Sequence, residues 1–152
     1  MSEAALPARF AALVGDFLAL APPDRVALLI ELGDDLPELP EHLRSHPELL
    51  EPVTECQSPL SVLAVVEHSG AGAVVRLHVA AAPHAPVTRG FAGVLHTTLD
   101  GSPASEVLAL PGDVAGALGL DGVVSPLRLR GFTALLARVQ RQVAVGTQGV
   151  SD

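Results

Sequence analysis

The chain has 152 residues, of which 49% are hydrophobic and 17% are charged, and its formal net charge is −8. This length and apolar content suffice for one compact domain with a sizeable core. The negative charge, together with four Phe and no Trp or Tyr, argues against nucleic-acid binding through phosphate neutralisation and base stacking.

The basic residues and the single cysteine exclude several kinds of cofactor and metal site. All nine basic residues are arginines, so this chain cannot itself form a Schiff base with a cofactor such as pyridoxal phosphate. One cysteine cannot form an internal disulfide or supply several thiolates to a metal, which excludes zinc ribbons and cysteine-ligated clusters held by one chain. No apolar run approaches the ~18 residues of a membrane span, and the N-terminus lacks the basic and apolar regions of a signal peptide. We therefore expect a cytoplasmic protein.

Two helices are predicted at the start of the chain. Residues 6–20 carry one apolar stripe at helical spacing, formed by Leu6, Phe10, Leu13, Phe17 and Leu20. Pro22-Pro23 ends this helix and begins the next, which has Asp24 in its first turn and Gly33 as its stop. We expect the two helices to pack as an antiparallel pair.

An acidic stretch follows over residues 31–55, with eight acidic residues against one basic residue, Arg44. A charge run of this kind is commonly a solvated surface. The alternative is an acidic docking surface that steers a basic partner toward the segment that comes next.

Two strands are predicted over residues 60–67 and 74–80, joined by the glycine-rich turn Ser69-Gly70-Ala71-Gly72. The first run is apolar on both faces, which favours a central strand. In the second, Val75, Leu77 and Val79 alternate with Val74, Arg76 and His78, so one face is predicted to be covered and the other partly wet.

Helices dominate the rest of the chain. Thr88 is predicted to cap a helix that carries Phe91, Val94, Leu95 and Leu99 inward, and two short helices are predicted over residues 103–109 and 113–118. Ser125-Pro126 opens a last helix that runs to about residue 143, with the inward stripe Phe132, Leu135, Leu136, Val139 and Val143. The sequence thus predicts an α+β fold, a small antiparallel sheet with helices packed on it, in a single domain of residues 1–145. The polar, glycine-rich residues 146–152 are predicted to be a disordered tail.

Cys56 lies in the segment Glu51-Pro-Val-Thr-Glu-Cys-Gln-Ser-Pro-Leu60. Pro52 and Pro59 exclude a helix interior and predict a shaped loop just ahead of a strand. Free cysteine is often a small buried hydrophobe, but a polar, proline-bracketed loop is a poor place for inert packing, so we interpret Cys56 as the reactive residue. Glu55 disfavours the thiolate, so a reactive sulfur requires compensation from Arg128, Arg89 or a helix N-terminus.

Arg128 is a second candidate for a functional role, because its predicted position is unfavourable for a charge. It falls in the first turn of the last helix, in line with Phe132 and Leu135 on the inward stripe, where a cation opposes the helix dipole and needs an acceptor. We expect backbone carbonyls, a carboxylate or the Cys56 loop to hold it, either as a structural tether or as part of the site.

The histidines do not form a specific pattern. His42 and His46 have the i, i+4 spacing of metal ligands, but Pro47 follows at once and no third ligand has a recognisable spacing. A Cys-His hydrolase through His84 or His78 stays open as an alternative, although nothing in the spacing supports it specifically.

Four blocks of sequence occur in order: Leu36-Pro-Glu-Leu-Pro40 with His46-Pro-Glu-Leu-Leu50, then Glu55-Cys-Gln-Ser58, then Thr88-Arg-Gly90, then Ser125-Pro-Leu-Arg-Leu-Arg-Gly131. Together they resemble the SufE family of sulfur acceptors, which activate cysteine desulfurases for iron–sulfur cluster assembly. The resemblance covers about residues 10–143.

The resemblance implies an α+β fold like that of iron–sulfur cluster scaffold proteins. It also implies that Cys56 receives a sulfane sulfur from the persulfide of a SufS-type cysteine desulfurase, stimulates that enzyme, and passes the sulfur to a downstream scaffold. The chain would be a carrier rather than an enzyme, a monomer or weak homodimer, with no metal or cofactor of its own, because the pyridoxal phosphate belongs to the desulfurase.

The same resemblance implies supporting positions around the cysteine. Gln57 and Ser58 belong to the cysteine motif, and Arg128, Arg89 and Gly90 match residues that family members carry. Two departures from the family pattern are Ser61, where many relatives have an aromatic residue, and His84, where they have an aspartate.

Two other functions are kept as alternatives. One is a Cys-dependent hydrolase or peroxidase, which turns over a small substrate without a protein partner. The other is an acidic protein-interaction module in which Cys56 is incidental.

Overall fold

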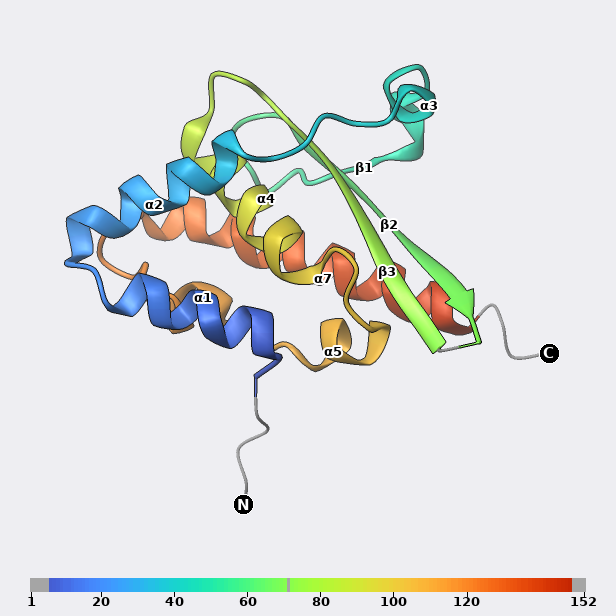
Figure 1. The fold of residues 1–152 in the computed structure, drawn as a ribbon. Coiled ribbons are helices and arrows are strands. Elements are labelled where there is room, and N and C mark those ends of the chain that lie inside the picture. The colour runs from blue at the N-terminus through green and yellow to red at the C-terminus, as the bar shows by residue number, and fades with distance from the viewer. Residues whose placement is uncertain (1–5, 71, 149–152) are drawn as a thin grey trace.

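The computed structural model describes residues 6–70 and 72–148. Its elements follow in chain order: α1 (Ala8–Leu18), α2 (Pro22–Asp34), α3 (Glu41–Arg44), the 3-10 turn η1 (Pro47–Leu49), β1 (Glu51–Pro52), β2 (Leu60–Ser69), β3 (Gly72–Ala81), α4 (Pro86–Leu99), α5 (Ala104–Ala109), α6 (Val114–Ala117) and α7 (Pro126–Gln148). The long hairpin of β2 and β3 lies beside the helices, with α7 running behind α4 (Figure 1). The predicted α+β fold, a small antiparallel sheet covered by helices, is confirmed.

The sheet has three strands in the order β1-β2-β3, and both pairings are antiparallel. β2 is therefore the central strand, as its two apolar faces predicted. The hairpin is regular from Leu60 opposite Ala81 to Ser69 opposite Gly72, so both strands reach closer to the turn than predicted. β1 was not predicted, because a two-residue strand that contains a proline carries no periodic signal.

The core lies between the hairpin and the two longest helices. The alternation predicted for β3 is confirmed, since Val75, Leu77 and Val79 are buried and Arg76 is exposed. The inward stripes predicted for α4 and α7 are also buried. Where the two helices meet, the rings of Phe91 and Phe132 stack with their centroids 4.6 Å apart, so this pair fixes how α4 and α7 sit against each other.

Glycines let α2 and α4 approach closely. A methyl group at Gly33 would lie 2.7 Å from the Gly90 nitrogen, one at Gly90 would lie 2.6 Å from Leu29, and one at Gly93 would overlap the Leu32 carbonyl oxygen. The prediction that Gly33 stops α2 is wrong, because the helix continues to Asp34 and Gly33 serves this contact instead. The principal partner of α2 is therefore α4, rather than α1 as expected from their short connection.

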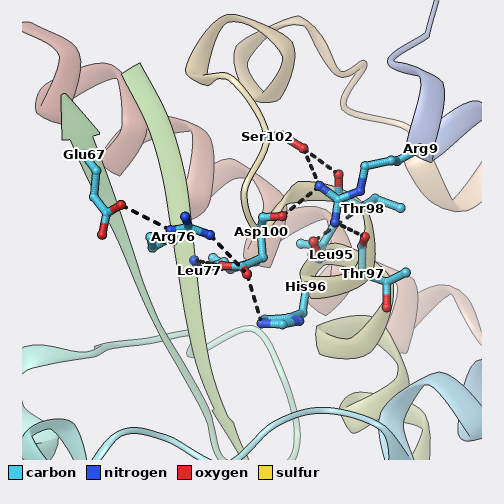
Figure 2. Close-up of polar contacts among 10 residues, drawn as sticks. All are labelled: Arg9, Glu67, Arg76, Leu77, Leu95, His96, Thr97, Thr98, Asp100 and Ser102. Atoms are coloured by element: carbon cyan, nitrogen blue, oxygen red, sulfur yellow. Dashed lines mark hydrogen bonds and ion pairs between the residues drawn. The ribbon is translucent and has the colours of Figure 1, made fainter. Parts of the chain in front are cut away.

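Polar contacts join α1 and β3 to the end of α4 (Figure 2). Arg9 donates to the backbone oxygens of Thr97 and Asp100 at 2.5 and 2.7 Å, and to Ser102 Oγ at 3.0 Å. The Asp100 carboxylate accepts the Leu77 N–H at 2.8 Å. These contacts satisfy carbonyl groups that the end of a helix leaves without intrahelical partners.

The start of α4 and the end of α7 also differ from prediction. The prediction that Thr88 caps α4 is wrong, because Pro86, whose fixed φ suits the first helical position, already begins the helix after Ala85, and Thr88 is buried inside the first turn. α7 begins as predicted, with Ser125 Oγ accepting the Arg128 N–H at 3.3 Å. It continues past residue 143 to Gln148, so residues 146–148 of the predicted disordered tail are helical, and residues 149–152 lie outside the described residues.

Candidate functional site: the Cys56 loop

Cys56 sits on the loop that connects β1 to β2. Two backbone hydrogen bonds shape this loop: the Val53 N–H donates to the Leu60 oxygen at 2.8 Å, and the Cys56 N–H donates to the Val53 oxygen at 3.1 Å. The loop therefore turns back on itself, as the bracketing prolines predicted, and leaves Cys56 half-buried and packed against the core.

The Cys56 sulfur rests on the backbone of α7 at Gly131. A Cβ atom at position 131 would lie 2.5 Å from Cys56 Sγ and 3.4 Å from Cys56 Cα. Only glycine leaves room for the sulfur in this place. Gly131 belongs to the last sequence block compared with the family, but the sequence carried no sign that it touches the cysteine.

A small cavity of ≈ 110 Å³ opens beside the sulfur. Its wall is formed by the cysteine motif, by the first two turns of α4 with the two residues before them, and by the start of α7. It comprises Cys56, Gln57, Ser58, His84, Ala85, Pro86, Val87, Thr88, Phe91 and Arg128. The predicted residues Gln57, Ser58 and Arg128 therefore share one cavity with Cys56. The cavity could receive one or a few atoms next to the sulfur, with a cation at its wall.

Arg128 lines this cavity but is not buried, so the predicted inward arginine with a fixed acceptor is wrong. Its side chain is exposed and makes no hydrogen bond or ion pair with any residue in the described ranges. The physical reason is its place in the first turn, ahead of the point where Gly131 and Phe132 begin the buried face of α7. A guanidinium without an acceptor is more stable in water than inside the protein.

Arg89 and Gly90 lie apart from the sulfur. Arg89 donates to the backbone oxygens of Ala81 and Gly33, both at 3.2 Å, and so ties the end of β3 to α2. Gly90 packs against Leu29. Neither residue lines the Cys56 cavity, so both act here on the packing of α4.

The cation that meets the Cys56 loop is Arg138, which the sequence analysis did not single out. Its Nη2 lies 2.9 Å from Glu55 Oε1, and its Nε lies 3.3 Å from Glu51 Oε2. Arg141 and Gln142 also hold Glu51 from the next turn of α7. Because these partners are far apart in sequence and Arg138 only flanks the inward stripe, no local pattern indicated the contact.

The local charges keep Cys56 as a thiol at rest. Burial raises the pKa of Cys56, and the neighbouring Glu55 carboxylate raises it further, whereas the Arg138 guanidinium lowers it. The prediction that Glu55 opposes the thiolate agrees with this balance. The compensating cation is Arg138 rather than Arg89 or Arg128.

Much of the acidic stretch is paired. Glu51 and Glu55 meet the arginines of α7, Glu38 and Glu41 meet Arg44, and Glu48 lies 3.1 Å from His46 Nδ1. The carboxylates nearest the cysteine are therefore engaged within the molecule. A docking role for the stretch stays a prediction.

The histidines separate into different places. His84 lines the Cys56 cavity, although no hydrogen bond joins the two side chains in the part of the chain described. His78 faces another groove, together with His42 and His96. Across residues 6–70 and 72–148, no group of three or more His, Cys, Asp or Glu side chains is placed to hold a metal ion. In the same ranges, no helix combines the length and apolarity that crossing a membrane requires.

The sequence as a whole matches one family. A family model described as "SufE: Fe-S metabolism associated domain" matches residues 11–143, which include Cys56, Gly131 and Arg138. The chain belongs to the SufE family. This membership supports a role in iron–sulfur metabolism.

Relatives agree over almost the full length. The chain is 46% identical over 142 residues to SufE-like proteins of two Mycobacterium tuberculosis strains, covering 93% of this chain and 96% of each relative. It is 31% identical over 135 residues to a SufE-like protein of Rhizobium etli, covering 88% of both chains. The solution structure of a hypothetical protein from Thermus thermophilus superposes with a TM-score of 0.82 at 33% identity, covering 95% of this chain and 99% of that one.

Proposed function

We propose that this SufE-family protein is a sulfur carrier that takes a persulfide sulfur from a cysteine desulfurase onto Cys56, stimulates that enzyme and delivers the sulfur for iron–sulfur cluster assembly. The observation that supports the proposal is the environment of Cys56. Its thiol is half-buried on a shaped loop and lies beside a ≈ 110 Å³ cavity, and the exposed side chain of Arg128 lines that cavity. A carrier needs one accessible thiol with room for one more sulfur atom, and a single half-buried thiol beside this cavity supports the proposal.

The transfer is a displacement at sulfur. The Cys56 thiolate attacks the terminal sulfur of the partner's persulfide, a new S–S bond forms at Cys56, and the partner's S–S bond breaks. The partner's cysteine leaves as a thiolate, so the sulfane sulfur moves without net oxidation or reduction. The proton that Cys56 loses goes to solvent or to the departing thiolate, and passing the sulfur onward repeats the same exchange.

The surrounding residues have separable roles in this proposal. Arg128 is an exposed cation at the cavity wall and suits the negative charge of a persulfide, while Gln57, Ser58 and His84 give the cavity a polar lining. Arg89 and Gly90 support the site through the packing of α4 rather than by contact with the sulfur. Because the thiol is favoured at rest, the proposal includes activation of Cys56 when a partner docks.

The partner we propose is a SufS-type desulfurase that holds the pyridoxal phosphate, since this chain has no lysine to bind it. The proposed recipient is a downstream iron–sulfur scaffold. The chain itself acts as a carrier, as a monomer or weak homodimer in the cytoplasm.

Intact-mass analysis tests the proposal. The protein is mixed with free cysteine and a desulfurase from the same source, beside Cys56→Ser and desulfurase-free controls. We expect a mass gain of one sulfur atom that reductant reverses and that both controls lack. No gain beside a demonstrably active desulfurase would contradict a carrier role.

A sample of the protein alkylated at Cys56 distinguishes the sulfur carrier from the alternative functions. A Cys-dependent hydrolase or peroxidase would turn over a small substrate without the desulfurase, and alkylation of Cys56 would abolish that turnover. A plain interaction module would bind its partner equally well after alkylation. We expect no turnover without the desulfurase, and we expect alkylation to block sulfur uptake, because Cys56 Sγ is the atom that accepts the transferred sulfur.

A further inference from the structure

One arginine contacts two carboxylates of the segment that leads into Cys56. Glu51 and Glu55 stand at the two ends of the segment that leads into the cysteine, and Arg138 contacts both carboxylates at 3.3 and 2.9 Å. The segment is thereby fastened to α7, on the helix that also carries Gly131 under the sulfur. We call Arg138 with Glu51 and Glu55 the clasp.

The clasp differs from an ordinary surface ion pair. The Arg138 side chain is only 18% exposed, and its Nη1 is 3.4 Å from the Ala134 oxygen one turn back. Its Nε is buried and makes no hydrogen bond with any described residue, despite lying near Glu51. Burying a guanidinium in this way costs free energy unless acceptors surround it, so its position depends on the two carboxylates.

The clasp and the sulfur contact act on the same short segment. Cys56 directly follows Glu55, so the place of the Glu55 carboxylate limits where Sγ can lie. Because Gly131 and Arg138 are seven residues apart on α7, which is about two helical turns, the loop is held at two points along one side of the helix.

We propose that Arg138 is a positioning residue for Cys56: by clasping Glu51 and Glu55 it holds the loop on α7 with the sulfur seated against Gly131. Release of the clasp frees the loop and presents the sulfur. That this serves transfer to a partner rests on the proposed function, whereas the positioning itself does not.

The clasp also sets the charge that the sulfur meets. The charged or titratable groups around Cys56 are Glu51 and Glu55 on its own segment, Arg138 and Arg128 on α7, and His84 on the approach to α4. Arg138 is the cation paired with Glu55, so its removal leaves that carboxylate uncompensated beside the thiol. A role limited to helix packing would not change the titration of Cys56.

Alkylation kinetics separate position from charge. The rate of Cys56 modification by iodoacetamide is followed by intact mass from about pH 7 to about pH 11, a range that extends well above the pKa of an ordinary thiol, about 8.5, because the pKa of Cys56 is raised. The midpoint of the profile reports the thiol pKa, and the plateau at high pH reports how accessible the thiolate is. No desulfurase is needed.

Three variants give distinct expectations. Arg138→Gln raises the plateau by about threefold or more, as a loop freed from local contacts opens more often; its midpoint combines loss of the cation, which raises it, with loss of burial, which lowers it. Arg138→Lys keeps the charge but lacks the planar fork that spans two carboxylates, so the plateau rises and the midpoint falls as the freed sulfur becomes less buried. Glu55→Gln lowers the midpoint, because the anion beside the thiol is gone, and raises the plateau.

Two control variants remove the same charge elsewhere. Arg141→Gln loses a contact to Glu51 but none to Glu55, so its plateau should rise less than that of Arg138→Gln. Arg44→Gln disrupts the remote pairs with Glu38 and Glu41 and should match the wild type.

The proposal is overturned if folded Arg138→Gln, checked by circular dichroism, has the wild-type plateau. If that variant does not fold, wild-type plateaus in both Arg138→Lys and Glu55→Gln overturn it instead. These results do not depend on sulfur transfer, so a protein that took up no sulfur could still show the clasp, and a proven carrier could lack it.

Discussion

The contact between Cys56 Sγ and Gly131 predicts the outcome of one added methyl group. In Gly131→Ala the new Cβ would lie 2.5 Å from the sulfur, and ordinary contact begins at 3.4 Å. The sulfur must therefore move outward by about 1 Å, toward the neighbouring cavity, because the helix backbone beneath it is the less yielding side.

Two opposing effects set the change in stability. Replacing glycine by alanine inside a helix contributes about 0.5–1 kcal/mol of stability. Overpacking costs about 1–3 kcal/mol, and the low end applies here because the atom that must move is the end of a side chain on a loop with a cavity beside it. We expect the free energy of unfolding to change by about 1 kcal/mol or less from these terms.

A matched control isolates the strain. Gly15 lies in α1 with nothing within 4 Å of the place that an added methyl group would occupy, so Gly15→Ala should be stabilised by about 0.5–1 kcal/mol without strain. Urea unfolding should find Gly131→Ala lower than Gly15→Ala by roughly 1–2 kcal/mol, and iodoacetamide should modify its Cys56 severalfold faster. If both variants were equally stabilised and Cys56 of Gly131→Ala were alkylated at the wild-type rate, the contact between the sulfur and Gly131 would be refuted.

Three further predictions test the helix packing and the polar contacts that support the site. Gly93→Ala should lower the free energy of unfolding by about 2–3 kcal/mol, measured by urea unfolding, because its methyl group would overlap the Leu32 carbonyl oxygen; a neutral result would contradict the close approach of α2 and α4. Arg9→Ala should lower it by about 1–3 kcal/mol, since three hydrogen bonds to the end of α4 are lost, and Arg9→Lys should recover part of the loss. Hydrogen bonds from Arg141 and Gln142 lower the pKa of Glu51, so its charge contributes stability above the unfolded-state pKa of about 4.3 that is lost as the pH falls through the folded-state value. Glu51→Gln should therefore be less stable than the wild type at pH 7, and this difference should shrink in unfolding measured at about pH 2; a difference that is constant with pH would contradict the assignment.

Local patterns predicted most elements because each pattern reports which residues face a core. The alternation of Val75, Leu77 and Val79 located the inner face of β3, and the spacing from Phe132 to Val143 located that of α7. Errors arose where neighbours in space decide the outcome. The sequence alone indicated that Gly33 ends a helix, whereas the structure shows that it contacts α4. The sequence also indicated that Arg128 points inward, whereas the buried face of α7 begins only at Gly131.

By itself, the sequence determined the fold class, the central strand, the loop that carries Cys56 and the family blocks, because these depend on composition, periodicity and order along the chain. Only the tertiary structure decided what the sulfur touches and which cation faces it. Gly131 under Sγ and Arg138 between Glu51 and Glu55 are contacts between segments far apart in the chain. Such contacts produce no periodic pattern in the sequence. The need for glycine at position 131 and the partners of Arg138 are evident only when α7 is packed against the Cys56 loop.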